Sequence, residues 1–115
     1  MLPLLYSEGV RKGRFPLTQL VRLVSENPAR LFGMYPEKGT ISVGSDADLT
    51  VFDPGLETVI TPGRLQTNCD YSPYEGMVVH GWPVHTLVRG QLVVENRSFV
   101  GRPGYGRFLA RKPLP

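Results

Sequence analysis

The chain has 115 residues, of which 41% are hydrophobic and 20% are charged, a balance typical of one globular domain with a buried core. No run approaches about 18 consecutive apolar residues, so we expect no membrane-spanning helix. The first ten residues lack a basic segment and include Glu8, which argues against a secretion signal. Cys69 is the only cysteine, which excludes an internal disulfide and favours a reducing, cytoplasmic location.

The formal net charge of +3 is unevenly distributed along the chain. Residues 97 to 115 hold five of the thirteen basic residues and none of the ten acidic ones, so residues 1 to 96 carry a charge of about −2. The basic residues of this tail are spread among Gly and Pro, without an aromatic RNA-binding signature, a helix-turn-helix or a zinc pattern. We therefore expect no nucleic-acid partner and interpret the tail as a docking arm.

A first helix is predicted over residues 3 to 12. Pro3 suits the first turn, and Gly13 is placed to end the helix. Its apolar residues fall on one face: Leu2, Leu5 and Tyr6.

A second, clearer helix follows, because apolar residues recur at the i, i+3, i+4 and i+7 spacing of an amphipathic helix that packs on something larger. These residues are Leu17, Leu20, Val21 and Val24. Asn27 and Pro28 predict that this helix stops and that another begins with Asn27 as its N-cap, ending at Gly33.

After Gly39 the pattern changes to period two, which indicates strands. The predicted strands are 49–52, 58–60, 77–80, 84–89 and 92–95. The turn Asp53-Pro54-Gly55 closes the first of them. Gly90-Gln91 fits a two-residue hairpin of type II′, with Gly first. Helices followed by strands in separate blocks predict an α+β fold.

The tail, residues 97 to 115, is rich in Gly and Pro and is expected to be extended and to depend on other surfaces for its order. It carries three aromatic residues that could anchor it in pockets: Phe99, Tyr105 and Phe108. We expect it to be mobile in the isolated chain and to pack on another subunit or on a missing part of a longer protein.

Asp46, Asp48 and Asp53 lie within eight residues of "KGTISVGSDADLTVFDP", residues 38 to 54. Three carboxylates this close could bind a metal, transfer protons or shape a turn. No His or Cys occurs in this stretch, and the regular ligand spacing of a calcium loop is absent. We therefore interpret the three Asp residues as turn-forming.

His80 and His85 are five residues apart on either side of Gly81 and Pro83, which we interpret as a turn, and no third ligand is evident. We interpret both as strand histidines. Cys69 could act as a nucleophile only beside a base in an electropositive setting, and an inert thiol is the simpler interpretation.

Other candidate motifs carry little chemistry. The serines include no G-x-S-x-G elbow, and "GRPGYG" at 101–106 lacks the G-K-[ST] ending of a phosphate loop. In "SPYEG", residues 72–76, Glu75 is expected to fix a turn. We assign no catalytic, cofactor-binding or metal-binding residue to this chain.

Two stretches carry a resemblance to a known family. "ENPARLFGMYPEKGTISVGSDADLTVFDP" resembles the segment in which metal-dependent cyclic amidohydrolases leave their catalytic barrel and enter a small β-sandwich. "NCDYSPYEGMVVHGWPVHTLVRGQLVVENRSFVGRPGYGRFLARKP" resembles the C-terminal region of hydantoinases and dihydropyrimidinases. The resemblance runs from Leu2 to Pro113, and allantoinases share part of it.

The resemblance implies that residues 1–35 are closing helices of a TIM barrel, 36–96 part of a composite β-sandwich and 97–115 an extended basic tail. It implies hydrolysis of the C–N bond of a cyclic amide by the intact enzyme, with two divalent metal ions, expected to be zinc, and a carboxylated lysine. The metal ligands of the family lie upstream of the matching segment, so the chain is expected to be a catalytically incomplete last quarter with an incomplete sheet. The alternatives are a non-catalytic split subunit that assembles with other chains, or an allantoinase-like relative.

Overall fold

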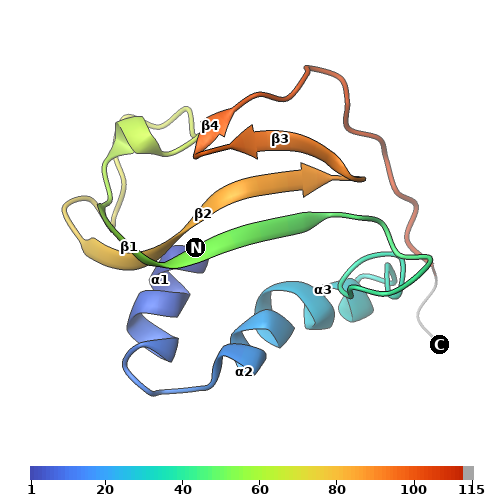
Figure 1. Ribbon diagram of the computed structural model, residues 1–115, viewed down its shortest axis with the longest axis horizontal. Coiled ribbons are helices and arrows are strands. Elements are labelled where there is room, and N and C mark those ends of the chain that lie inside the picture. The colour runs from blue at the N-terminus through green and yellow to red at the C-terminus, as the bar shows by residue number, and fades with distance from the viewer. Residues whose placement is uncertain (113–115) are drawn as a thin grey trace.

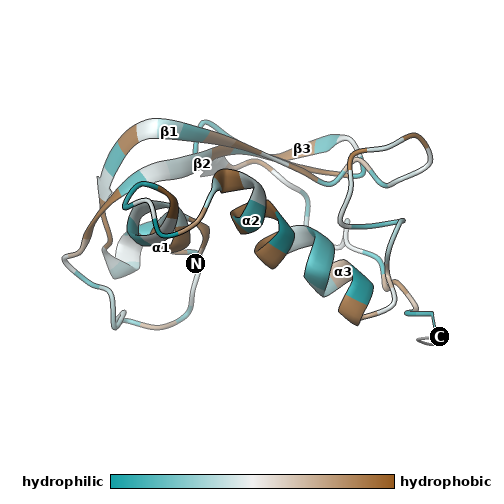
Figure 2. Cartoon of the chain, turned by 90° about the horizontal axis from the view of Figure 1, so that it is seen from below, coloured by the Kyte–Doolittle hydropathy of each residue, from teal (hydrophilic) through white to brown (hydrophobic). Residues whose placement is uncertain are grey.

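The computed structural model describes residues 1–112, in which helices are followed by the strands of one antiparallel sheet (Figure 1). Both views place the helices on one side of the sheet (Figures 1 and 2). The mixture of helices and antiparallel sheet confirms the expected α+β class. Residues 113–115, which belong to the predicted tail, lie outside the described part.

The first helix consists of α1 (Leu2–Leu5), which continues as the π-helix η1 (Tyr6–Val10). Gly13 ends it with a φ of +69°, and the Gly13 N–H donates to the Val10 carbonyl at 3.0 Å. Because Gly has no Cβ, it adopts this left-handed conformation at little cost. The predicted helix and its stop are confirmed.

The second helical region is continuous through α2 (Leu17–Val21), the π-helix η2 (Arg22–Glu26) and α3 (Asn27–Leu31). The prediction that a helix ends at Asn27 is therefore wrong. Asn27 is helical, with φ −61° and ψ −46°, and its N–H donates to the carbonyl of Arg22 in a wide π turn. This wider turn makes room for the ring of Pro28, which would clash with a carbonyl in a regular α-helix.

Gly33 ends this region as predicted, with a φ of +66°. The Gly33 N–H donates to the Arg30 carbonyl at 3.1 Å, and the Met34 N–H donates to the Ala29 carbonyl at 2.8 Å. These two bonds form a Schellman motif, which satisfies the last free carbonyls of the helix.

The sheet has the order β1-β2-β3-β4, with every neighbouring pair antiparallel. Its strands are β1 (Leu49–Val59), β2 (Val78–Val88), β3 (Gln91–Glu95) and β4 (Ser98–Phe99). A single 3₁₀ turn, η3 (Pro62–Arg64), interrupts the long β1–β2 connection. Among residues 1–112, β1 has a strand partner on one side alone and forms an edge of the sheet.

Two pairs of predicted strands are in fact single strands with bulges. Three residues of β1 lie between Asp53 and Glu57, but their partners Trp82 and His80 on β2 have one residue between them, so the Asp53-Pro54-Gly55 stretch is part of a bulge inside β1. Gly81 and Pro83 likewise lie inside β2, and the predicted turn between His80 and His85 is wrong. A bulge keeps turn-forming residues within a strand when the partner strand continues past them.

Both hairpin turns differ from expectation. The β2–β3 turn is Arg89-Gly90, with φ values of +45° and +78°, so it is type I′ and begins one residue earlier than the predicted type II′ turn. A second turn with two positive φ values, Asn96-Arg97, leads to β4. The sheet therefore extends into the segment predicted to be an extended tail.

The core lies between the helices and the sheet. Its buried hydrophobic residues are Leu20, Ala29, Ile60 and Val79. Tyr6 and Phe52 pack edge to face with ring centroids 4.9 Å apart, above Gly81. A Cβ on Gly81 would lie 2.5 Å from Phe52 and 2.6 Å from Tyr6, so only Gly fits beneath these rings.

The predicted amphipathic stripe is only partly buried within residues 1–112. Leu20 is 1% exposed, but Leu17 and Val21 are both 53% exposed. Figure 2 shows the hydrophobic bands on α2 and α3. In the part of the chain that the structure describes, no helix is long and apolar enough to cross a membrane.

Candidate functional site

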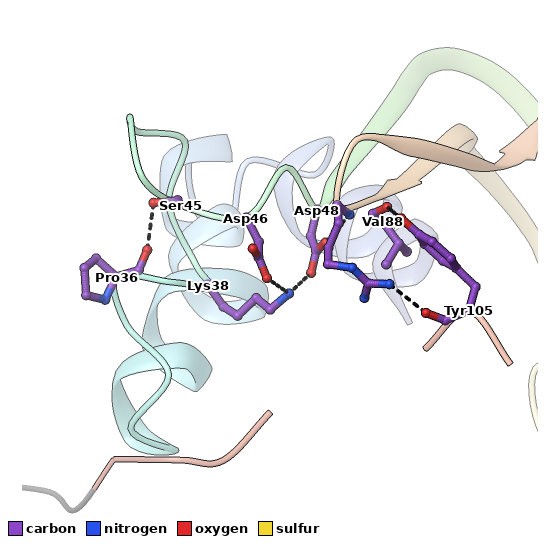
Figure 3. Close-up of polar contacts among 8 residues, drawn as sticks. Pro36, Lys38, Ser45, Asp46, Asp48, Val88 and Tyr105 are labelled. Atoms are coloured by element: carbon purple, nitrogen blue, oxygen red, sulfur yellow. Dashed lines mark hydrogen bonds and ion pairs between the residues drawn. The ribbon is translucent and has the colours of Figure 1, made fainter. Parts of the chain in front are cut away.

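The largest group of charged side chains in contact lies where the loop before β1 meets the β2–β3 turn (Figure 3). Lys38 lies between the carboxylates of Asp46 and Asp48, with its Nζ 2.8 Å from the nearer oxygen of Asp46 and in contact with Asp48. The Asp48 carboxylate also accepts the backbone N–H of Arg89 at 2.7 Å. Together with Tyr105, which contacts Arg89, these residues form a group that we call the Lys38 cluster: Lys38, Asp46, Asp48, Arg89 and Tyr105.

The loop that carries this cluster is ordered by its own polar groups. The Ser45 hydroxyl donates to the Pro36 carbonyl at 2.7 Å, and the Asp46 N–H donates to the Glu37 carbonyl at 2.9 Å. The Asp48 N–H donates to the Asp46 carbonyl at 2.8 Å. These bonds bring both carboxylates to the same side of the loop, toward Lys38.

The charges of the cluster support one another. Burial by itself would raise the pKa of Asp48, but the hydrogen bonds from Lys38 and from the Arg89 N–H outweigh it and hold the pKa below its ordinary value. Burial by itself would lower the pKa of Lys38, but the hydrogen bonds to Asp46 and Asp48 outweigh it and raise the pKa. The lysine therefore stays protonated and Asp48 stays ionised at neutral pH.

Arg89 and Tyr105 join the tail to this cluster. The Arg89 guanidinium carbon lies 4.3 Å from the centroid of the Tyr105 ring, and its Nη2 donates to the Tyr105 carbonyl at 2.6 Å. The Tyr105 hydroxyl donates to the Val88 carbonyl at 3.1 Å.

These contacts indicate that the cluster stabilises the fold and is poorly suited to catalysis. A carboxylate already bound by an ammonium group and a backbone N–H is a poor general base, because its pKa is low and its lone pairs are occupied. Asp53 has a similar local role, since its Oδ1 accepts the Gly55 N–H at 2.8 Å and shapes the bulge. The turn-forming interpretation fits the Asp53 side chain, whereas the side chains of Asp46 and Asp48 connect the loop to Lys38 and, for Asp48, to Arg89.

His80 and His85 point to separate partners. His80 Nε2 lies 3.5 Å from Glu57, its partner on the neighbouring strand β1, and the His80 N–H donates to the buried Ser7 hydroxyl at 3.2 Å. His85 Nδ1 accepts the Asn96 N–H at 3.3 Å. Each imidazole therefore belongs to a different cross-strand contact.

The remaining candidates lie in surface segments. Cys69 is exposed, and its N–H donates to the Thr67 hydroxyl at 3.3 Å. In the 72–76 segment the Tyr74 N–H donates to the Ser72 hydroxyl at 3.2 Å, which shapes the turn through Ser72, and the turn-fixing role expected of Glu75 stays a prediction. In the 101–106 segment Tyr105 carries the interaction with Arg89.

Within residues 1–112 no group of three or more His, Cys, Asp or Glu side chains is arranged to hold a metal ion. The two-metal centre that the resemblance implies therefore does not fit the described residues of this chain.

The sequence identified the acidic members of the Lys38 cluster and Tyr105 as an anchor of the tail, but it did not identify Lys38 or Arg89. One signal was available, because Lys38 is the only basic residue between positions 38 and 54. The contact of Arg89 with Tyr105 joins residues 16 apart and had no such signal.

Comparison with known proteins identifies relatives of nearly the whole chain. D-hydantoinase of Geobacillus stearothermophilus is 53% identical over 108 residues, which is 94% of this chain and 23% of that protein. L-hydantoinase of Paenarthrobacter aurescens is 44% identical over 111 residues, or 96% of this chain and 24% of that protein. The chain thus spans about a quarter of the length of these relatives.

A solved structure shares the fold. The crystal structure of dihydropyrimidinase from Brevibacillus agri NCHU1002 superposes with a TM-score of 0.93 at 50% identity, covering 96% of this chain and 24% of that one. The family model described as "Amidohydrolase family" matches residues 2–93. The chain therefore belongs to the amidohydrolase family.

Proposed function

We propose that this chain is the C-terminal part of a cyclic amidohydrolase of the hydantoinase and dihydropyrimidinase type. The intact protein would hydrolyse the C–N bond of a cyclic amide such as a hydantoin or a dihydropyrimidine. The observation that carries this proposal is the identity of 53% over 94% of the chain to a D-hydantoinase. A cytoplasmic location, expected from the single cysteine, stays a prediction.

The proposed role of this segment is to complete the scaffold. Residues 1–35 would close the catalytic barrel, residues 36–96 would form part of the sandwich, and the tail from 97 would contribute to assembly. The metal ions and the residues that hold them would belong to the rest of the longer protein. The polar contacts of the Lys38 cluster, which are structural, support this division of roles.

Apolar side chains exposed on the helices support the proposal that another part of the longer protein covers them. Leu31 is 65% exposed and Phe32 is 50% exposed, beside an open apolar hollow lined by Leu23 and Pro28. Contiguous apolar surface of this kind is stabilised by burial, at about 25 cal/mol per Å². The free edge of β1 would be completed in the same way, by a strand of the longer protein.

The relatives also bear on whether this segment determines the stereochemistry of the substrate. It is similar to enzymes named for D-hydantoinase and for L-hydantoinase activity. Because both a D-hydantoinase and an L-hydantoinase contain a similar segment, we propose that the segment is part of the scaffold and does not determine substrate handedness.

A chimera tests the proposal. The matching quarter of the G. stearothermophilus D-hydantoinase is replaced by this chain, and the purified product is assayed for metal content and for hydantoin ring opening. We expect both to be retained. The matched control carries Leu20→Asp, which places a charge at a buried core position and should abolish assembly.

Two results would contradict the proposal. One is a folded chimera that retains its metal but opens no cyclic amide. The other is metal-dependent ring opening by the 115-residue chain alone, because the scaffold role requires the isolated chain to be inactive.

A further inference from the structure

Residues 100–112, which we call the strap, connect the sheet to the end of the helical layer (Figure 1). At its start, the N–H groups of Val100 and Gly101 donate to the Val93 carbonyl at 2.9 and 3.1 Å. At its far end, the Lys112 N–H donates to the Gly33 carbonyl at 2.9 Å. The strap is thus tied to its own chain at both ends, where the sequence suggested an arm that reaches another surface.

The middle of the strap is held by the mutual contacts of Arg89 and Tyr105. Arg89 covers the Tyr105 ring and donates to its carbonyl, while the Tyr105 hydroxyl donates back to Val88. Residues 97–115 contain no acidic side chain, so this segment offers an arginine no side-chain carboxylate. A ring face and a carbonyl are the contacts that a planar guanidinium can use instead.

Arginine is an unfavourable residue for the backbone conformation that Arg89 adopts. It occupies the first position of a type I′ turn, with a φ of +45°, where Asn, Asp and Gly are favoured. Arg accepts this left-handed conformation at a steric cost. The Asp48 carboxylate stabilises the turn by accepting the Arg89 N–H. The guanidinium contacts with Tyr105 stabilise the folded chain and so oppose this cost.

The other basic and aromatic side chains of the strap are poor anchors. Arg102, Arg107 and Arg111 are exposed, and the Phe108 side chain is 91% exposed. Tyr105 and Leu109 are the half-buried large side chains between the two ends of the strap, and Tyr105 alone of the two makes polar contacts with the β2–β3 turn region.

We propose that Arg89 and Tyr105 form a latch that holds the strap against its own chain, and that opening this latch releases the strap from the end of α3. The Lys38 cluster supports the latch through Asp48, so the loop before β1, the β2–β3 turn and the strap act as one unit. Release would leave the sheet and helices folded and would expose Tyr105, which is half-buried in the docked strap.

Amide hydrogen exchange of the 115-residue chain tests the latch, because the Lys112 N–H reports whether the strap is docked on Gly33. Arg89→Asn suits the type I′ turn but lacks the guanidinium, and Tyr105→Leu removes the ring face and the hydroxyl. We expect each variant to speed exchange at Lys112 by about tenfold or more. Arg89→Asn loses the charge-assisted bond to the Tyr105 carbonyl and the cation–π contact, and Tyr105→Leu loses the cation–π contact and the hydroxyl bond to Val88. Arg102→Asn is the matched control and should leave the rate unchanged.

The amide of Ile60, which donates to the Met77 carbonyl in the core, reports whether the fold itself is intact. The proposal holds if exchange at Lys112 accelerates while exchange at Ile60 does not, and if Arg89→Asn/Tyr105→Leu is no worse than the stronger single variant. Unchanged exchange at Lys112 in both single variants would overturn it. Equal acceleration at Ile60 and Lys112 would also overturn it, because Arg89 would then support the whole fold.

Discussion

Toward Gly81 and Val59, the β1–β2 pair is held by buried apolar side chains, whereas near Leu49 and Leu87 it is held by the partly exposed charges of the Lys38 cluster. At the apolar end Val79 is completely buried. At the polar end the side chain of Lys38 is 24% exposed and that of Asp48 is 34% exposed.

The difference lies in how each end responds to change. Buried apolar contacts are sensitive to shape and volume, and insensitive to salt and pH. Partly exposed ion pairs contribute less, and their contribution is screened by salt and lost when either partner changes its charge. Four substitutions separate these two behaviours, taken from the largest expected effect to the smallest.

Gly81→Ala should destabilise the apolar end most. The new Cβ would lie within 2.6 Å of both Tyr6 and Phe52, at a residue with a φ of +82°. Overpacking and backbone strain together predict a loss of about 3 to 4 kcal/mol in the free energy of unfolding, measured by urea denaturation. Gly76→Ala is the matched control, because its φ is +81° and nothing lies within 4 Å of the new Cβ. Equal losses in the two variants would show that the space under the rings is unimportant.

Leu20→Ala tests how much the burial of α2 against the core contributes to stability. Leu20 is 1% exposed, so its truncation should cost about 3 kcal/mol, the sum of lost burial and a residual cavity. Leu17→Ala, one turn earlier and 53% exposed, should cost much less in the same urea titration. A similar cost at both positions would mean that α2 buries a different face in solution.

Lys38→Met should weaken the polar end by about 1 kcal/mol at neutral pH, because the two carboxylates lose their shared counterion. Its clearest effect should be on the pH dependence of unfolding. The lowered pKa of Asp48 gives a stabilisation that is present above its unfolded value of about 3.9 and is lost as the pH falls through the folded-state pKa.

The raised pKa of Lys38 has the opposite sign. It gives a stabilisation that is present below the unfolded value of about 10.4 and is lost as the pH rises through the folded-state pKa. Lys38→Met should remove the alkaline loss and reduce the acid loss, as measured by urea unfolding across the pH range. A variant that keeps both losses unchanged would place their origin outside the Lys38 cluster.

Glu26→Gln should have the smallest effect. Its carboxylate binds Arg30 at 3.0 Å one helical turn away, with 34% and 52% of the two side chains exposed. Such a pair contributes about 0.3 to 0.5 kcal/mol, and the difference from the parent chain should vanish in concentrated NaCl. Arg30 also lies 3.6 Å above the Tyr35 ring, so Arg30→Met should cost more and keep part of that cost at high salt. If salt abolishes both effects, the ring contact contributes nothing.

Local signals in the sequence were sufficient for the helices and for most strand positions. Gly13 and Gly33 end their helices as predicted, because a left-handed residue without a Cβ is a local requirement. The local role predicted for Asp53 agrees with its bond to the Gly55 N–H, since short polar side chains form hydrogen bonds with nearby backbone, whereas the side chains of Asp46 and Asp48 bind more distant partners. Asn27-Pro28 was misjudged because a π turn in the preceding residues accommodates the proline.

The sequence by itself determined the α+β class, the order of helices and strands, and the resemblance to the hydantoinase and dihydropyrimidinase family. Periodicity, turn residues and extended motifs all depend on residues that are close together along the chain. Only the tertiary structure decided that Asp53-Pro54-Gly55 and Gly81 lie inside continuous strands, because a bulge exists only opposite a partner strand. It alone decided that Lys38 meets Asp48 and that Arg89 holds Tyr105. These contacts depend on the path of the chain through space, which brings residues 10 and 16 positions apart into hydrogen-bonding distance.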